Sequence, residues 1–85
     1  MVQKPDDEIV ELSNVRNAIN RYFQQHPLAA DTVEGIAKWW LPRFGINLPL
    51  ESVLRALQGM VEAGELSKTE KHDGSVIYAL AQRKH

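Results

Sequence analysis

The clearest pattern in the chain lies in residues 53–80, VLRALQGMVEAGELSKTEKHDGSVIYAL. Its first part carries apolar residues at helical spacing, which predicts a helix with one apolar face. Those residues are Val53, Leu54, Leu57, Met60 and Val61. Gly64 follows where this helix must end, because a left-handed cap residue is least strained when it has no Cβ. Leu66 then opens an extended segment.

The second half of the same stretch predicts a β-hairpin. Asp73-Gly74 is a strong short hairpin signal, since both central residues of a type I′ turn need positive φ. The returning strand is rich in β-branched and aromatic residues, namely Val76, Ile77 and Tyr78. We therefore expect strands over residues 65–71 and 75–81, joined by a type I′ turn.

A first helix is predicted to end at residue 25. Its apolar residues follow the i, i+3, i+4, i+7, i+8 pattern: Val15, Ala18, Ile19, Tyr22 and Phe23. His26-Pro27 ends it, because the residue before a proline avoids the α region. Residues 1–7 are polar and are expected to form a flexible tail, residues 8–81 one domain, and residues 82–85 a short polar tail.

A second helix is predicted over residues 32–41. Asp31 and Glu34 have the spacing of a capping box, in which each side chain pairs with the backbone of the other. Pro42 is expected to stop this helix or to allow at most one frayed turn, and residues 42–48 are expected to form a loop. Pro49 is placed in the first turn of the third helix, where its missing N–H costs nothing.

Composition limits the functions that the chain can have. Its 85 residues make one small domain with 44% apolar residues and a net charge of −1. The absence of cysteine excludes disulfides, thiolate metal sites and thiol catalysis, and it is compatible with a cytoplasmic location. No apolar run approaches the ~20 residues that cross a bilayer, so no membrane association is expected. No catalytic motif or metal-ligand spacing is present, which predicts a non-enzyme without cofactor or metal.

The order of helix, helix, loop, helix, strand, strand resembles a winged helix-turn-helix domain. The resemblance rests on this order, on TVEGIAKWW at residues 32–40, and on VLRALQGMVEAGEL at residues 53–66 leading into the hairpin. It implies an α+β fold of three helices with a C-terminal β-hairpin wing. It also implies a third, short strand near residues 29–30. The ten residues expected in the core are Val15, Ile19, Phe23, Ile36, Trp40, Val53, Leu57, Val61, Leu66 and Tyr78.

The resemblance further implies binding of double-stranded DNA in transcriptional control. On the outward face of the third helix the candidate contacts are Ser52, Arg55 and Gln58, since arginine and glutamine read guanine and adenine edges. On the wing they are Lys68, Lys71 and His72, which would position phosphates. The alternatives are that the helix residues are simply solvated and that the lysines protect a sheet edge.

A protein interface is the other candidate site. Trp39 and Trp40 point about 100° apart on a helix, and Trp40 fits the apolar stripe better. Trp39, with Phe44 nearby, is therefore a candidate contact with a protein partner or a second copy. The alternative is that the loop folds back and covers Trp39.

Two functions follow from these sites. The first is a DNA-binding transcriptional regulator, and the second is an interaction module or accessory subunit that does not bind DNA. The surface potential discriminates between them. A continuous positive strip over the third helix and the wing favours DNA, whereas a broken surface with an exposed aromatic patch elsewhere favours a protein partner.

Overall fold

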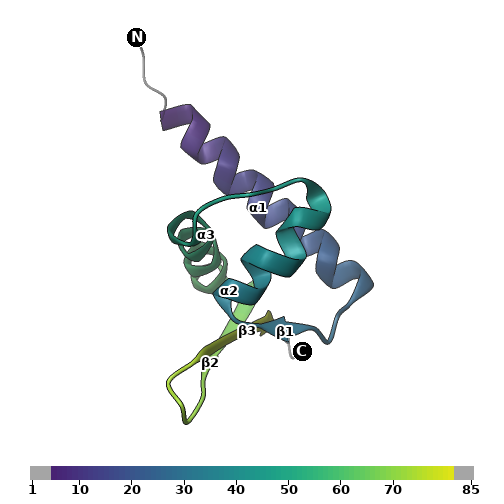
Figure 1. The fold of residues 1–85 in the computed structure, drawn as a ribbon, viewed down its shortest axis with the longest axis vertical. Coiled ribbons are helices and arrows are strands. Elements are labelled where there is room, and N and C mark those ends of the chain that lie inside the picture. The colour runs from purple at the N-terminus through teal and green to yellow at the C-terminus, as the bar shows by residue number, and fades with distance from the viewer. Residues whose placement is uncertain (1–4, 82–85) are drawn as a thin grey trace.

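The computed structural model describes residues 5–81, with side chains described from Glu11 onward. The fold is α+β, with three helices and a three-stranded antiparallel sheet (Figure 1). The elements are α1 (Pro5–Gln25), β1 (Ala30–Asp31), α2 (Val33–Gly35) with its π-helical and 3-10 continuations η1 (Ile36–Trp40) and η2 (Leu41–Phe44), α3 (Leu50–Glu62), β2 (Leu66–Glu70) and β3 (Val76–Leu80). Residues 1–4 and 82–85 of the predicted tails lie outside the described residues.

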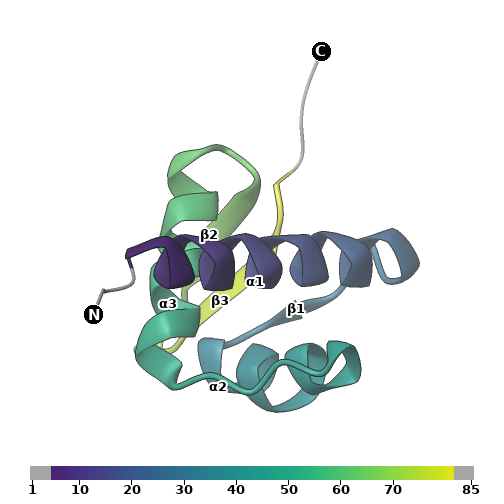
Figure 2. The same ribbon diagram turned by 90° about the horizontal axis from the view of Figure 1, so that it is seen from above.

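The sheet has the strand order β1-β3-β2, and both pairs are antiparallel. The expected short strand near residues 29–30 is confirmed, because Ala30 pairs with Ala79 and Asp31 with Tyr78. In Figure 1 the β2–β3 hairpin extends away from the helices, and Figure 2 shows α1 crossing above the sheet. Among the described residues, no helix combines the length and apolarity needed to span a membrane.

The hairpin forms as predicted, but its turn is not type I′. The Gly74 N–H donates to the Lys71 carbonyl at 2.9 Å, which places His72 and Asp73 at the centre of the turn. Gly74 alone of these residues has a positive φ, of 91°. Asp73 keeps a negative φ because its Oδ1 accepts hydrogen bonds from the Ser75 N–H and hydroxyl, at 2.9 and 2.7 Å. This local pairing favours a longer turn that ends in a left-handed glycine.

The second helical segment is longer and less regular than predicted. Only Val33–Gly35 is α-helical, and the chain then widens so that the Leu41 N–H donates to the Ile36 carbonyl. Pro42 lies inside one further 3-10 turn that runs to Phe44, which matches the alternative of a single frayed turn and not a stop at the proline. A proline ring crowds the carbonyl four residues earlier, and a wider turn relieves that contact. The predicted loop over residues 42–48 is therefore helical in its first part.

The predicted capping box is also wrong. Thr32 is the N-cap of α2, and its Oγ1 accepts a hydrogen bond from the Gly35 N–H at 3.1 Å. Asp31 belongs to β1, and its Oδ1 instead accepts from the Thr32 N–H at 2.8 Å. Because strand pairing holds the backbone of Asp31 in the sheet, the cap moves one residue along the chain.

The third helix agrees with the prediction at its end and differs by one residue at its start. Pro49 is the N-cap, just before Leu50, and not a residue of the first turn. Gly64 has a φ of 81° and follows the C-cap residue Ala63. Its N–H donates to the Val61 carbonyl, and the Glu65 N–H donates to the Met60 carbonyl, so these two carbonyls near the end of α3 are satisfied.

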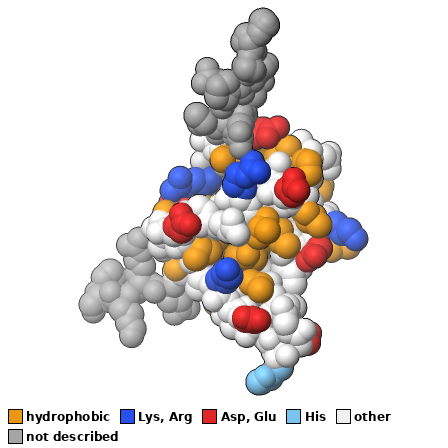
Figure 3. Space-filling model, turned by 90° about the vertical axis from the view of Figure 1, so that its left-hand side faces the viewer, with side chains coloured by type: hydrophobic (Ala, Val, Ile, Leu, Met, Phe, Trp, Pro, Cys, Tyr) orange, Lys and Arg blue, Asp and Glu red, His pale blue; other side chains and the backbone are white. Residues whose placement is uncertain are grey.

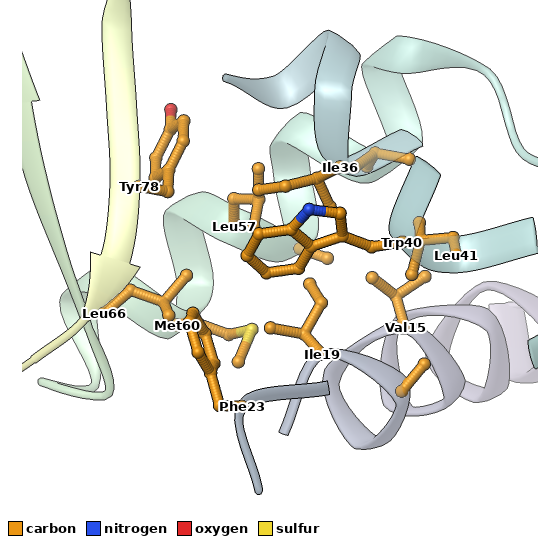
Figure 4. Close-up of a cluster of buried hydrophobic side chains, with 13 residues drawn as sticks. Val15, Ile19, Phe23, Ile36, Trp40, Leu41, Leu57, Met60, Leu66 and Tyr78 are labelled. Carbon is orange, nitrogen blue, oxygen red and sulfur yellow. The ribbon is translucent and has the colours of Figure 1, made fainter. Parts of the chain in front are cut away.

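The core lies between α1, the second helical segment, α3 and the sheet (Figure 4). Nine of the ten predicted core residues are buried, and Val61 is the exception because it is only half-buried at the edge. Four hydrophobic residues beyond those ten are buried, namely Ala18, Leu41, Ala56 and Met60, and of these Ala18 and Met60 lie on the apolar faces predicted for the first and third helices. Outside the core, Arg16 of α1 forms an ion pair with Glu65, which ties α1 to the turn that leaves α3.

Candidate functional site

The candidate DNA contacts on α3 lie on its outer side. Arg55 and Gln58 are exposed, whereas Ser52 is half-buried. They do not share one hollow. Arg55 lines the groove between α1 and α3 with Arg16, while Gln58 lies with Lys68 on the side of α3 that faces β2. The two side chains that would read bases are neighbours on the outer side of α3, three residues apart, but they border different hollows.

The candidate contacts on the hairpin are all exposed. Lys68 lies within β2, opposite Tyr78 of β3, and its side chain shares a shallow hollow with Glu62 of α3. Lys71 and His72 lie in the turn. In that turn, hydrogen bonds from Ser75 hold the pKa of Asp73 below its ordinary value, so the turn carries a negative charge beside Lys71.

Basic and acidic side chains alternate over this surface. The exposed acids on α3 and the hairpin are Glu51, Glu62, Glu70 and Asp73, and the exposed bases are Arg55, Lys68 and Lys71. Figure 3 shows the face on the α3 side, where blue and red groups are separated by white and by hydrophobic patches. Over the described residues, α3 and the hairpin therefore present no continuous positive strip.

Trp39 is the candidate protein contact that the structure leaves most accessible. It lies in η1 and is 68% exposed, whereas the neighbouring Trp40 is 3% exposed. The alternative that the loop folds back over Trp39 is wrong. The widened turn brings Ile36, Trp40 and Leu41 to the core together, so Trp39 is directed to solvent.

The exposed residues around Trp39 define a small surface that we call the Trp39 patch. Its members are Lys38, Trp39, Pro42 and Arg43, all exposed on η1 and η2. Two of the four are basic and none is acidic. The Arg43 guanidinium also lies over the ring of Tyr22, 5.7 Å from its centroid.

Phe44, the second predicted interface residue, is placed differently. It is half-buried, packs against the core and lines a hollow with Asn17 and Arg21 of α1. Its ring thus contributes to holding η2 on α1.

The sequence did not predict the contact of Arg43 with Tyr22. The two residues are far apart in the chain, and they meet only once η2 packs against α1.

The described residues contain no cluster of three or more His, Asp or Glu side chains that could hold a metal ion. Comparison with known proteins adds no family assignment: no protein-family model matches the chain. No curated protein matches its sequence significantly either.

Proposed function

We propose that this chain is a winged-helix-like module that binds a protein partner through the Trp39 patch. The three helices and the strand order β1-β3-β2 support the likeness to a winged helix. The exposure of Trp39 is the observation that carries the function. Tryptophan is among the residues most enriched in the energetic centres of protein interfaces. A small domain has little core material and would be more stable with this ring buried in its own core, so the exposure of Trp39 favours a role in binding.

The charge pattern supports a protein partner over nucleic acid. A duplex presents closely spaced phosphates, and binding depends on basic groups that neutralise them without interruption. On α3 and the hairpin, Glu51, Glu62 and Glu70 interrupt the bases and would repel phosphates.

The Trp39 patch indicates the chemistry of its partner. The indole requires an apolar pocket, where burial contributes roughly 25 cal/mol per Å² of apolar area removed from water. Lys38 and Arg43, exposed on the same two helical turns as Trp39, favour carboxylates at the rim of that pocket. The partner is thus a protein with an apolar pocket bordered by acidic residues.

Photo-crosslinking in the cells that make the protein tests this proposal. A p-benzoylphenylalanine at position 39 is compared with the same residue at position 58, since Trp39 and Gln58 are both exposed but lie on different elements. The expected result is a discrete protein adduct from position 39 and none from position 58. A nucleic-acid adduct from position 58, with no protein adduct from position 39, would overturn the proposal.

DNA binding is the second candidate function, favoured by one observation. Gln58 of α3 and Lys68 of β2 line the same hollow, so a base-reading residue and a phosphate contact lie side by side. If duplex DNA is the ligand, Arg55→Ala relaxes base preference, whereas Lys71→Ala weakens binding to all sequences alike. Titration of labelled duplex at low salt tests this candidate. Chemical shifts on α3 and the hairpin that stay unchanged at high DNA concentration would remove it.

A further inference from the structure

The outer edge of β2 has unpaired backbone groups. β2 pairs only with β3 among the described strands, so its other edge is open. Lys71 donates its N–H to Ser75, and Glu65 accepts from the Ala81 N–H, so both residues point their backbone groups toward β3. Backbone groups alternate in direction along an antiparallel strand. Those of Leu66, Lys68 and Glu70 therefore point away from the sheet.

The geometry points to a second copy of this chain as the occupant of that edge. We propose that two β2 strands pair antiparallel about Thr69 and join the two sheets into one. In such a pair, residues whose backbone groups point outward must lie opposite residues of the other copy that also point outward. Each allowed register therefore has one residue of β2 at its centre, where it lies opposite the same residue of the second copy. A centre at Lys68 or Glu70 places like charges directly opposite, which destabilises a strand pair.

The register centred on Thr69 has complementary charges. It places Lys68 of each copy opposite Glu70 of the other, so each such pair exchanges both backbone hydrogen bonds and adds an ion pair. The two Thr69 side chains meet at the two-fold axis, a favourable cross-strand contact. A centre at Ser67 lacks this benefit because it places Lys68 opposite Leu66.

The same register places glycines opposite one another at the ends of the strands. Gly64 of one copy lies opposite Gly74 of the other, and neither residue has a side chain. Both glycines have open space where a Cβ would be. The hairpin that carries this edge extends away from the helices (Figure 1). The edge is also accessible, since β2 is exposed from Ser67 to Glu70.

Sedimentation equilibrium at concentrations up to about 1 mM measures the association. The wild type is expected to form a dimer. Lys68→Glu and Glu70→Lys each place like charges opposite one another at both symmetric positions, so each raises the dimer dissociation constant at least about tenfold. Lys71→Glu is the matched control, because Lys71 lies opposite the uncharged Ser67 in this register and its reversal leaves the dimer unchanged.

Mixing the two charge-reversed variants gives the most specific outcome. Glu at position 68 of one chain then faces Lys at position 70 of the other, and the reverse pair is complementary too. The mixture is expected to form a heterodimer about as tight as the wild-type dimer. Glu62 lies beside Lys68 in the same chain, so Lys68→Glu also places two like charges together within one chain. Mixing the variants does not remove that repulsion, so recovery of the dimer on mixing reports the pairing between the two edges.

Two results would overturn the inference. One is a wild type that stays monomeric over the whole concentration range. The other is a dimer that the charge reversals leave intact, or that mixing fails to restore. Trp39→Ala is expected to keep the β2 dimer, so a dimer lost in that variant would assign self-association to the Trp39 patch instead.

Discussion

The ring of Tyr22 stacks on the indole of Trp40, with centroids 4.1 Å apart and planes inclined by 14°. Phe23, the next residue of α1, meets the same indole edge-on at 5.2 Å. Such aromatic pairs add stability beyond the area that they bury. Two residues of α1 thus hold Trp40 in the core, and this fixes the rotation of η1 that directs Trp39 to solvent.

Truncation of the two adjacent tryptophans is therefore expected to change the free energy of unfolding by very different amounts. Trp40→Ala removes a buried ring from the core and is expected to cost about 3–5 kcal/mol of the free energy of unfolding. Trp39→Ala removes an exposed ring and is expected to change it by no more than about 0.5 kcal/mol. Urea unfolding of both variants measures the difference. Equal losses would show that Trp39 contributes to the core.

Leu57 is a second test of the core. It is fully buried, and Leu57→Ala is expected to cost about 2–5 kcal/mol because the cavity cannot close in a small domain. Gln58→Ala, at the next and exposed position of α3, is the matched control and is expected to be near neutral. A Leu57→Ala variant as stable as Gln58→Ala would contradict the packing of α3 against α1.

Gly35 is expected to accept a side chain only at a cost in stability, because of Asp31. A Cβ at Gly35 would lie 2.1 Å from the Asp31 Oδ1, the atom that accepts the Thr32 N–H. Gly35→Ala must displace that carboxylate and is expected to cost about 1–3 kcal/mol. Thermal unfolding of Gly35→Ala and of Gly35→Ala with Asp31→Ala measures the coupling, and the double variant should recover part of the loss.

Gly59 provides the matched control for that substitution. It lies in α3, and nothing lies within 4 Å of the position that a Cβ would take. Gly59→Ala is expected to raise the free energy of unfolding by about 0.5–1 kcal/mol, since alanine restricts the unfolded chain and favours the helix. If Gly35→Ala stabilised the protein as Gly59→Ala does, the contact with Asp31 would not restrict that position.

The hairpin turn is expected to loosen in acid. The Ser75 hydroxyl and N–H bind the Asp73 carboxylate and lower its pKa below the ordinary 3.8. A lowered pKa means that the ionised form stabilises the turn above that value, and that the contribution is lost as pH falls through the folded pKa. The Ser75 amide chemical shift should follow this titration. Asp73→Asn should abolish it, and a shift that is flat in the wild type would contradict the contact.

Periodic patterns predicted most of the fold, because burial along a helix or strand depends on spacing. The apolar residues of α3 and the glycine at Gly64 gave that helix within one residue of its observed ends. The same method misplaced the cap at Asp31, because pairing with β3 recruited that residue into the sheet. It also missed the π-helical turn, since no local pattern shows how Pro42 is accommodated once Trp40 is held by α1.

The candidate site was predictable in part for the same reason. Helical spacing correctly separated Trp39 from Trp40, and it placed Arg55 and Gln58 on the outer side of α3. It did not show that these two residues border different grooves, because that depends on how α1 and β2 pack on either side of the helix.

Binding of a protein partner through Trp39 is tested by the affinity of the crosslinked partner for three purified proteins. Calorimetric titration of the wild type, Trp39→Ala and Gln58→Ala compares one exposed residue of the Trp39 patch with one exposed residue of α3. We predict that Trp39→Ala weakens binding at least about tenfold, as expected for a central aromatic contact, while Gln58→Ala stays within about twofold of the wild type. Loss of binding in Gln58→Ala, with Trp39→Ala unchanged, would contradict the account and assign the partner to α3.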